Sequence, residues 1–235
     1  MSVSEDTLYP HAYFGDQTEK VAQLRCLLAE KFPAMPPRAG GILRTGLAGV
    51  DAAEGGLRCG ALTELSAATG AGALFIHSMF RMVSQERCFA ALVDAARSFE
   101  PDCPAALVRL LVVFCADAMQ AVKATDLLLR DGNISLIMLD LQAVPLRQLQ
   151  RIPANTWHRL QRLAEQTTAA VVVLTPQPMV EAAQVRITAG EGWTLAAQRR
   201  WQRDLIAAAR WRVFVRRNAV HHTPAWESER ESAIA

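Results

Sequence analysis

Short apolar segments alternate with segments of helical periodicity through the middle of this chain. Five segments have the length and continuous apolar character of buried strands: Ala61–Leu65, Phe89–Val93, Leu110–Phe114, Ile134–Leu139 and Ala170–Leu174. Three others carry apolar residues at the spacing of an amphipathic helix: Ala73–Ser84, Ala118–Arg130 and Asn155–Gln166. Continuous apolar strands separated by helices are typical of a parallel sheet that is covered by helices on both faces. The pattern therefore predicts an α/β fold of this kind.

The chain begins with a segment of a different character. Asp16–Phe32 has the periodicity of an amphipathic helix. The Pro- and Gly-rich stretch 33–41 follows it and cannot continue a helix. A helix of this kind either folds onto the domain or docks a partner, and the sequence leaves both possibilities open.

After the fifth strand the pattern changes again. Ala183–Thr188 and Trp211–Arg217 predict two short strands, which suggests a short antiparallel extension at the C-terminal end of the sheet. The remaining residues predict a flexible tail. The expected organisation is an N-terminal helix with its linker, one core domain and a tail, at residues 1–41, 42–220 and 221–235.

Composition narrows the class of protein. With 235 residues, 51% of them hydrophobic, the chain can bury the core of one good-sized domain. Its longest apolar stretch, Leu110–Ala116, is far shorter than the roughly 20 residues that a membrane helix needs, and the N-terminus lacks the features of a signal peptide. The five cysteines form no CxxC pair and lie at no zinc-ligand spacing. We therefore expect a cytoplasmic protein without a membrane segment or a metal site.

Charge is segregated along the chain. Residues 1–140 carry 12 basic and 16 acidic side chains, whereas residues 141–235 carry 13 basic and 7 acidic ones. Seven arginines gather near the C-terminus: Arg199, Arg200, Arg203, Arg210, Arg212, Arg216 and Arg217. On a strand, Arg210, Arg212 and Arg216 would share the solvent face, opposite Val213 and Val215 on the core face. Such a stripe suits a solvated face, an acidic protein partner or weak contact with DNA, and these three remain open.

The order and content of these segments resemble the RecA recombinase family over about three-quarters of the chain. The resemblance is carried by Leu43–Asp51, Gly55–Leu65, Phe89–Ala95, Ile134–Asp140 and Val213–Asn218. Taken in the same order, these five segments are similar to the family's opening segment, its glycine turn with the first core strand, its second strand, its Walker B strand and its closing strand. The resemblance implies a RecA-like core with a mainly parallel sheet.

The segment that matches the phosphate-binding loop of this family departs from the family's pattern. A working loop reads GxxxxGK[ST], in which the lysine reaches the phosphates and the hydroxyl group binds Mg²⁺. Within Ser66–Leu74, Ala73 stands at the lysine position and Leu74 at the hydroxyl position. Ala96 stands where the recombinases carry a catalytic glutamate. The residues that remain of a nucleotide site are Thr69, Gly70, Gly72 and Asp140.

Phosphoryl transfer depends almost wholly on positioned charge. Because the lysine, the hydroxyl group and the glutamate are all replaced, we expect a pseudo-ATPase without catalytic residues or a cofactor. The four residues that remain would form a degenerate, non-functional nucleotide site.

A RecA-like core with a broken phosphate loop, an N-terminal helix and a basic C-terminal end resembles the ImuA proteins. These are accessory factors of bacterial damage-induced mutagenesis. The resemblance implies a non-catalytic scaffold in SOS-induced translesion DNA synthesis. Its implied partners are RecA, an ImuB-like inactive relative of the Y-family polymerases, and an error-prone polymerase.

Two alternatives remain. The first is a SulA-like inhibitor of cell division, which would bind the tubulin-like division protein and shares the fold and the missing phosphate loop. The second is a regulator that still binds a nucleotide at the turn of Gly70 and Gly72. That reading needs a cation from elsewhere, such as Arg216 or Arg217 of a neighbouring subunit.

Overall fold

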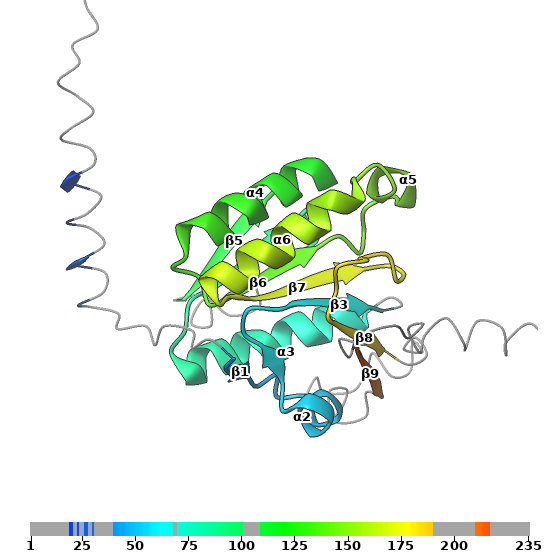
Figure 1. The fold of residues 1–235 in the computed structure, drawn as a ribbon, viewed down its shortest axis with the longest axis horizontal. Coiled ribbons are helices and arrows are strands. Elements are labelled where there is room, and N and C mark those ends of the chain that lie inside the picture. Colours follow the sequence, from blue (N-terminus) through cyan, green and yellow to red (C-terminus); the bar gives the residue numbers. More distant parts are fainter. Residues whose placement is uncertain are drawn as a thin grey trace, which may run out of the picture. The chain divides into compact units, whose positions relative to one another are not determined.

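Among the described residues, seven strands form one sheet in the order β5-β4-β6-β7-β3-β8-β9 (Figure 1). Their bounds are β3 (Leu62–Ser66), β4 (Ala90–Asp94), β5 (Leu110–Phe114), β6 (Leu136–Asp140), β7 (Ala170–Thr175), β8 (Val185–Ala189) and β9 (Trp211–Val215). All neighbours are parallel except β8 and β9, which are antiparallel. This confirms the predicted α/β fold with a short antiparallel extension.

The computed structural model describes residues 19, 20, 23, 26, 27, 30, 40–67, 70–100, 109–189 and 210–216. The chain divides into two compact units, residues 1–35 and 36–235. In the first unit the described residues are helical and exposed, as the N-terminal periodicity predicts. The expected tail at 221–235 lies outside the described residues.

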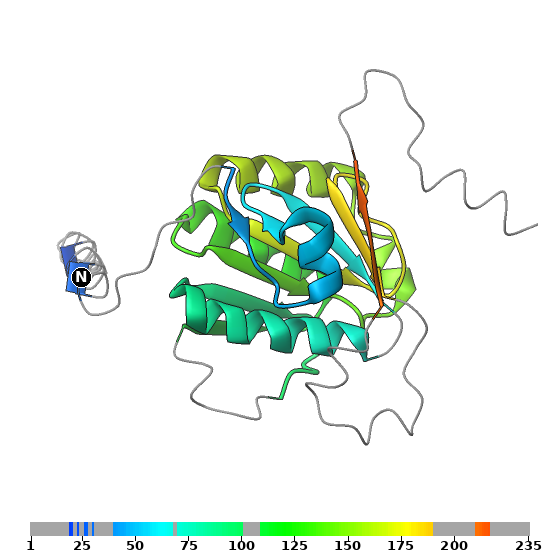
Figure 2. The ribbon, with the colours of Figure 1, turned by 90° about the horizontal axis from the view of Figure 1, so that it is seen from below.

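Helices cover both faces of the sheet, which explains why its central strands are apolar on both sides. On one face lie α4 (Ala118–Asp131) and α6 (Ala154–Thr167), with the four-residue helix α5 (Leu146–Leu149) before α6. On the other face lie α2 (Ala48–Glu54) and α3 (Ala71–Glu86), which Figure 2 shows in front of the sheet. Two apolar cores result, one between the sheet and each helical layer.

A small two-stranded element precedes the main sheet, and the apolar pattern does not predict it. Here β1 (Ile42–Leu43) pairs antiparallel with β2 (Leu57–Arg58), and α2 lies between them in the chain. The carboxylate of Asp51 holds the turn into α2, because it accepts hydrogen bonds from the backbone N–H and the hydroxyl of Thr45 at 2.9 and 2.7 Å. Ala61 and Leu62, which follow β2 in the chain, are buried.

The last two strands differ in direction from a simple antiparallel extension. β8 runs parallel to β3, and only β9 reverses. Residues 176–184 therefore carry the chain from the carboxyl end of β7 back to the amino end of β8, without a helix. Val180, Ala182 and Ala183 of this crossover pack into the core beneath α4 and α6. The crossover thus covers part of the sheet that a helix would otherwise cover.

Candidate functional site

The carboxyl ends of the parallel strands meet at one edge of the sheet, and this edge holds the residues predicted to form a nucleotide site. Asp94 ends β4 and Asp140 ends β6. Gly70 and Gly72 lie just beyond the end of β3, where the chain turns into α3. The structure therefore brings Gly70, Gly72 and Asp140 to the same edge, whereas Thr69 lies outside the described residues.

The turn into α3 matches the predicted phosphate loop, and the structure describes residues 66–67 and 70–74 of it. Gly70 precedes the helix with φ 92°, in the left-handed region that favours glycine. Ala73, at the lysine position, is exposed, and Leu74, at the hydroxyl position, is buried. The described part of this turn, residues 66–67 and 70–74, carries no cationic side chain and no free carboxylate. No side chain of these described residues could neutralise a bound anion.

The side chain of Gln142 occupies the space next to this turn. A Cβ atom on Gly72 would lie 1.7 Å from Gln142 Oε1, so the carboxamide group rests against the glycine backbone. Gln142 Nε2 donates to the carbonyl of Ala67 at 3.4 Å, and the Gln142 backbone N–H donates to Asp140 Oδ1 at 3.0 Å. Any side chain at position 72 would therefore collide with the carboxamide group of Gln142. The sequence analysis did not single out Gln142.

Two carboxyl groups lie side by side beneath Gln142. Asp94 and Asp140 are register partners on neighbouring strands, and both are buried. Asp94 is held by the backbone N–H groups of Ala96 and Phe99, at 2.9 and 2.7 Å. Burial raises the pKa of Asp140 to about 6; the Gln142 N–H lowers it, and the nearby Asp94 raises it further. Asp140 is therefore half protonated near pH 6 and mostly ionised at pH 7.

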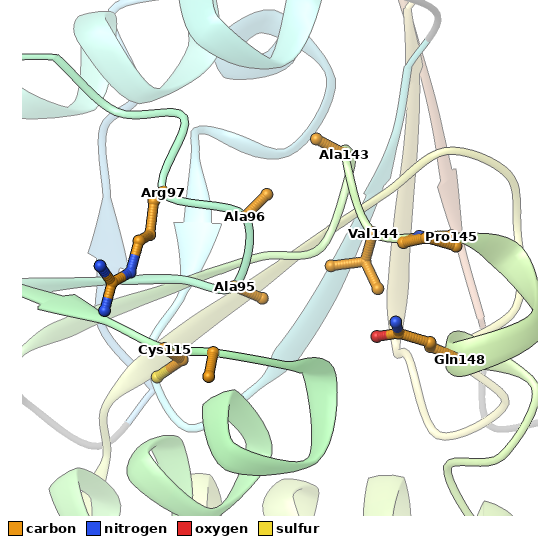
Figure 3. A pocket seen from close by; sticks show the side chains of 9 residues that line it. Ala95, Ala96, Arg97, Cys115, Ala143, Val144, Pro145 and Gln148 are labelled. Carbon is orange, nitrogen blue, oxygen red and sulfur yellow. The ribbon is translucent and has the colours of Figure 1, made fainter.

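A shallow hollow of about 280 Å³ opens at the carboxyl ends of β4, β5 and β6 (Figure 3). Its lining is made of small and apolar side chains with one amide, one thiol and one cation: Ala95, Ala96, Arg97, Cys115, Ala116, Ala143, Val144, Pro145 and Gln148. Ala96, at the position of the recombinase glutamate, contributes a methyl group to this hollow. The guanidinium group of Arg97 points away from Ala143 and Val144 (Figure 3). The lining holds no carboxylate that could position an attacking water.

The predicted basic stripe lies at one end of the sheet. Arg210, Arg212 and Arg216 are exposed on and beside β9, whereas Val213 and Val215 pack against the core, so the predicted facing is confirmed. Arg216 also donates from Nη1 to the carbonyl of Glu181, at 3.1 Å. The other four arginines of the set lie outside the described residues: Arg199, Arg200, Arg203 and Arg217.

A buried ion pair lies beside this end of the sheet, and the sequence analysis missed it. Glu64, in the middle of β3, is fully buried, and its Oε2 lies 2.8 Å from Nε of Arg186 on β8. Its Oε1 accepts from the backbone N–H groups of Met179 and Val180 and from the hydroxyl of Thr175. The sequence did contain a signal for this ion pair, because Glu64 lies within a segment predicted to be a buried strand, where a carboxylate needs a partner. Glu64 therefore holds the 176–184 crossover against β3 through the backbone of Met179 and Val180.

Across the described residues, no three histidine, cysteine or carboxylate side chains come together as metal ligands. Within the same part of the chain, no helix is both long enough and apolar enough to cross a bilayer.

No protein-family model matches this chain, and no curated protein matches it. Among solved structures, it is similar to the crystal structure of the RadB recombinase, with a TM-score of 0.52 and 16% sequence identity. The match covers 63% of this chain and 83% of that chain. At this identity the similarity shows the fold alone, which is RecA-like.

Proposed function

We propose that this chain is a non-catalytic accessory protein of SOS-induced mutagenesis and translesion DNA synthesis. In this role it would scaffold RecA, an ImuB-like inactive relative of the Y-family polymerases and an error-prone polymerase. The observation that carries the proposal is a RecA-like fold in which the segment matching the phosphate loop has neither a lysine nor a hydroxyl group at the expected positions. Ala73 and Leu74 replace the functional side chains, and Gln142 lies against Gly72. Contacts with partners would then need no nucleotide.

The exposed arginines of β9 are the proposed contact surface. Arg210, Arg212 and Arg216 extend from the last strand of the sheet. Arginine forms paired hydrogen bonds with carboxylates and phosphates, so the same stripe would suit an acidic protein surface and, more weakly, DNA. Arg212 lies on β9, and Arg210 and Arg216 directly flank its two ends, so the sheet holds the stripe in place.

The first experiment is affinity capture of the tagged chain from DNA-damaged host cells, with bound proteins identified by mass spectrometry. We expect recovery of RecA and polymerase subunits, and loss of that recovery when Arg210, Arg212 and Arg216 are all replaced by glutamate. A matched control reverses three exposed arginines on the α5–α6 side, Arg147, Arg151 and Arg162, and should leave recovery unchanged. Recovery of the tubulin-like division protein instead would contradict the proposal and favour a SulA-like inhibitor.

The absence of catalysis needs its own test, by isothermal titration of ATP with and without Mg²⁺ and by phosphate release. We expect neither binding nor hydrolysis. Replacing Gln142 by alanine empties the space beside Gly72 but supplies no cation, so this variant should also fail to bind. Mg²⁺-dependent binding by the unaltered protein at micromolar concentration would revive the nucleotide-regulator alternative.

A further inference from the structure

The arginine stripe of β9, formed by Arg210, Arg212 and Arg216, is a concentrated positive charge without a counter-charge. All three side chains are exposed, and they lie within residues 210–216. None of them has an ion pair among the described residues. Arg216 donates to the backbone carbonyl of Glu181 rather than to a carboxylate. The stripe therefore offers three guanidinium groups to an acidic ligand.

An aromatic ring interrupts the stripe. Arg212 and Phe214 share one face of β9, because side chains alternate along a strand, and Arg210 and Arg216 flank the strand at the same spacing. Phe214 is partly exposed, and its register partner on β8 is Arg186, whose guanidinium group pairs with Glu64. This face of β9 thus combines three unpaired cations with one ring that solvent still reaches.

The chain that follows β9 has the complementary pattern. Trp226 is followed by a glutamate at every second position, at Glu227, Glu229 and Glu231, with Arg230 as the cation among them. We call Trp226–Glu231 the acidic segment; it lies outside the described residues. Carboxylates form paired hydrogen bonds with guanidinium groups, and an indole ring stacks on them. The acidic segment therefore matches the stripe in charge and in its single large ring.

The acidic segment is attached at one end of the stripe. The Arg216 N–H donates to the carbonyl of Gln184 at 2.8 Å, so residue 217 leaves the sheet beside Arg216. Residues 217–226 then precede Glu227, and ten extended residues span about 33 Å. The stripe from Arg216 to Arg210 is about 20 Å long at the rise of a strand. The acidic segment can therefore fold back along the whole stripe.

We infer that the acidic segment folds back onto the arginine stripe of its own chain, with its glutamates paired to the arginines and Trp226 against Phe214. One exposed ion pair is weak. A short tether, however, keeps the segment at an effective concentration in the millimolar range, so several weak contacts suffice to occupy the stripe. The segment becomes an internal competitor for the surface that is proposed to bind partners, and only this consequence rests on the proposed function.

The competition sets a threshold for partners. A ligand of the stripe binds only those molecules in which the acidic segment is displaced, so its apparent dissociation constant rises by the inverse of that fraction. A weakly acidic surface is then excluded. A surface with more carboxylates, or with carboxylates and an apolar anchor, displaces the segment. The stripe therefore selects partners of high acidic charge density.

Photo-crosslinking of the full chain tests the contact in the absence of any partner. Benzoylphenylalanine in place of Phe214 should crosslink within the monomer to the peptide that contains Trp226. The same group in place of Leu127, an exposed residue of α4, should not. Neutralising the segment should lower the yield at least about threefold, by the changes Glu227→Gln, Glu229→Gln and Glu231→Gln. Raising the salt concentration to about 0.5 M should also lower it, because salt screens exposed ion pairs.

Three results would contradict the inference. A crosslink from position 214 that never reaches residues 226–231 would place the acidic segment elsewhere. A crosslink found only between two chains would assign the segment to a neighbouring copy. A yield that neither salt nor the glutamine changes affect would show that charge does not hold the contact.

Competition with an added anion provides a second measurement, which does not need the photoreactive group. The probe is a fluorescein-labelled polyglutamate peptide, followed by anisotropy at low salt. The glutamine variant of the segment should bind the probe about threefold more tightly or better than a control with the same net charge. That control neutralises three exposed acids elsewhere: Glu100, Asp131 and Glu181.

The difference should disappear when Arg210, Arg212 and Arg216 are all replaced by glutamine, because the segment then has nothing to cover. Equal affinities of the two variants with the stripe intact would overturn the inference. Neither experiment contains a partner protein, so their failure leaves the proposed function standing, and a failed affinity capture leaves this contact standing.

Discussion

Asp140 ends β6 inside the molecule with 8% of its surface exposed. Its partners are a backbone N–H from Gln142 and the neighbouring carboxyl group of Asp94. One hydrogen bond does not replace the water that an ionised carboxylate loses on burial, so the neutral acid is favoured at this position. Burial thus determines the charge state of this residue.

Replacing Asp140 by asparagine should therefore change stability in a pH-dependent way. The pKa is about 6 in the folded protein against an ordinary 3.8, so the folded state holds a proton that the unfolded chain releases between about pH 4 and 6. The stability contributed by Asp140 falls as pH rises through that window. Asp140→Asn stays neutral and keeps an oxygen for the Gln142 N–H.

Urea unfolding followed by tryptophan fluorescence is the measurement. The variant should match the parent protein near pH 4 and exceed its free energy of unfolding by about 3 kcal/mol at pH 7. A difference that does not vary with pH would show that folding does not raise the pKa of Asp140.

At the residue scale, the sequence identified positions by type but not by contact. Ala73, Leu74 and Ala96 were predicted to be replacements from their identities alone, and this assignment stays a prediction. Gln142 was not found, because its effect depends on a side chain reaching Gly72, seventy residues earlier in the chain. Such a contact leaves no local pattern in one sequence.

The crossover between β7 and β8 is the element whose stability depends most on a single side chain. Glu64 accepts hydrogen bonds from Thr175, Met179 and Val180 and pairs with Arg186. Removing the carboxylate would leave two backbone N–H groups and a largely buried guanidinium group without this partner. Such losses are expensive in the interior of a protein.

We expect Glu64→Ala to lower the free energy of unfolding by about 3–5 kcal/mol. Arg186→Met should cost less, because the carboxylate keeps its other three donors. Urea denaturation of both variants measures which of them loses more free energy of unfolding. Hydrogen exchange at the Met179 and Val180 amides should rise in the glutamate variant first. An equal or larger loss in the arginine variant would contradict a bracing role centred on Glu64.

Helix α2 offers a matched pair of glycines. A Cβ atom on Gly49, inside the helix, would meet Trp211 at 3.5 Å, an ordinary contact. Gly55 ends the helix with φ 77°, in the left-handed region. Gly49→Ala should raise the free energy of unfolding by about 0.5–1 kcal/mol, because alanine is the better helix former. Gly55→Ala should lower it by a similar amount or more.

Thermal unfolding of the two variants separates these effects. An increase in melting temperature for Gly49→Ala and a decrease for Gly55→Ala is the expected result. A decrease in both would mean that the contact between α2 and Trp211 leaves no room for a methyl group.

The elements differ in how well periodicity revealed them. β5 was predicted at its observed bounds, and α4 and α6 within one residue at each end, because each has several apolar residues at a regular spacing. The short helix α2 went unnoticed because only Val50 of its seven residues is buried. Two-residue strands such as β1 are too short to show any alternation.

At the scale of the whole molecule, the sequence indicated the layers but not the order of strands. A parallel sheet follows from apolar strands between helices, but periodicity contains no information on neighbours. The direction of β8 illustrates this. Its sequence fits either direction, and it lies parallel to β3 because the crossover 176–184, fixed by buried Glu64, returns the chain to the other end of the sheet.

The strand order has a consequence for synthesis on the ribosome. β3 is the first strand of the main sheet to be made, and its two neighbours, β7 and β8, are among the last. Contacts between such distant parts of a chain form slowly. β4, β5 and β6 can pair with one another as they emerge from the ribosome. Both edges of β3 stay unpaired until more than a hundred further residues have been synthesised. The nascent chain therefore carries an unpaired core strand from residue 66 until β7 is made at residue 170, a stage at which chaperones protect such segments from aggregation.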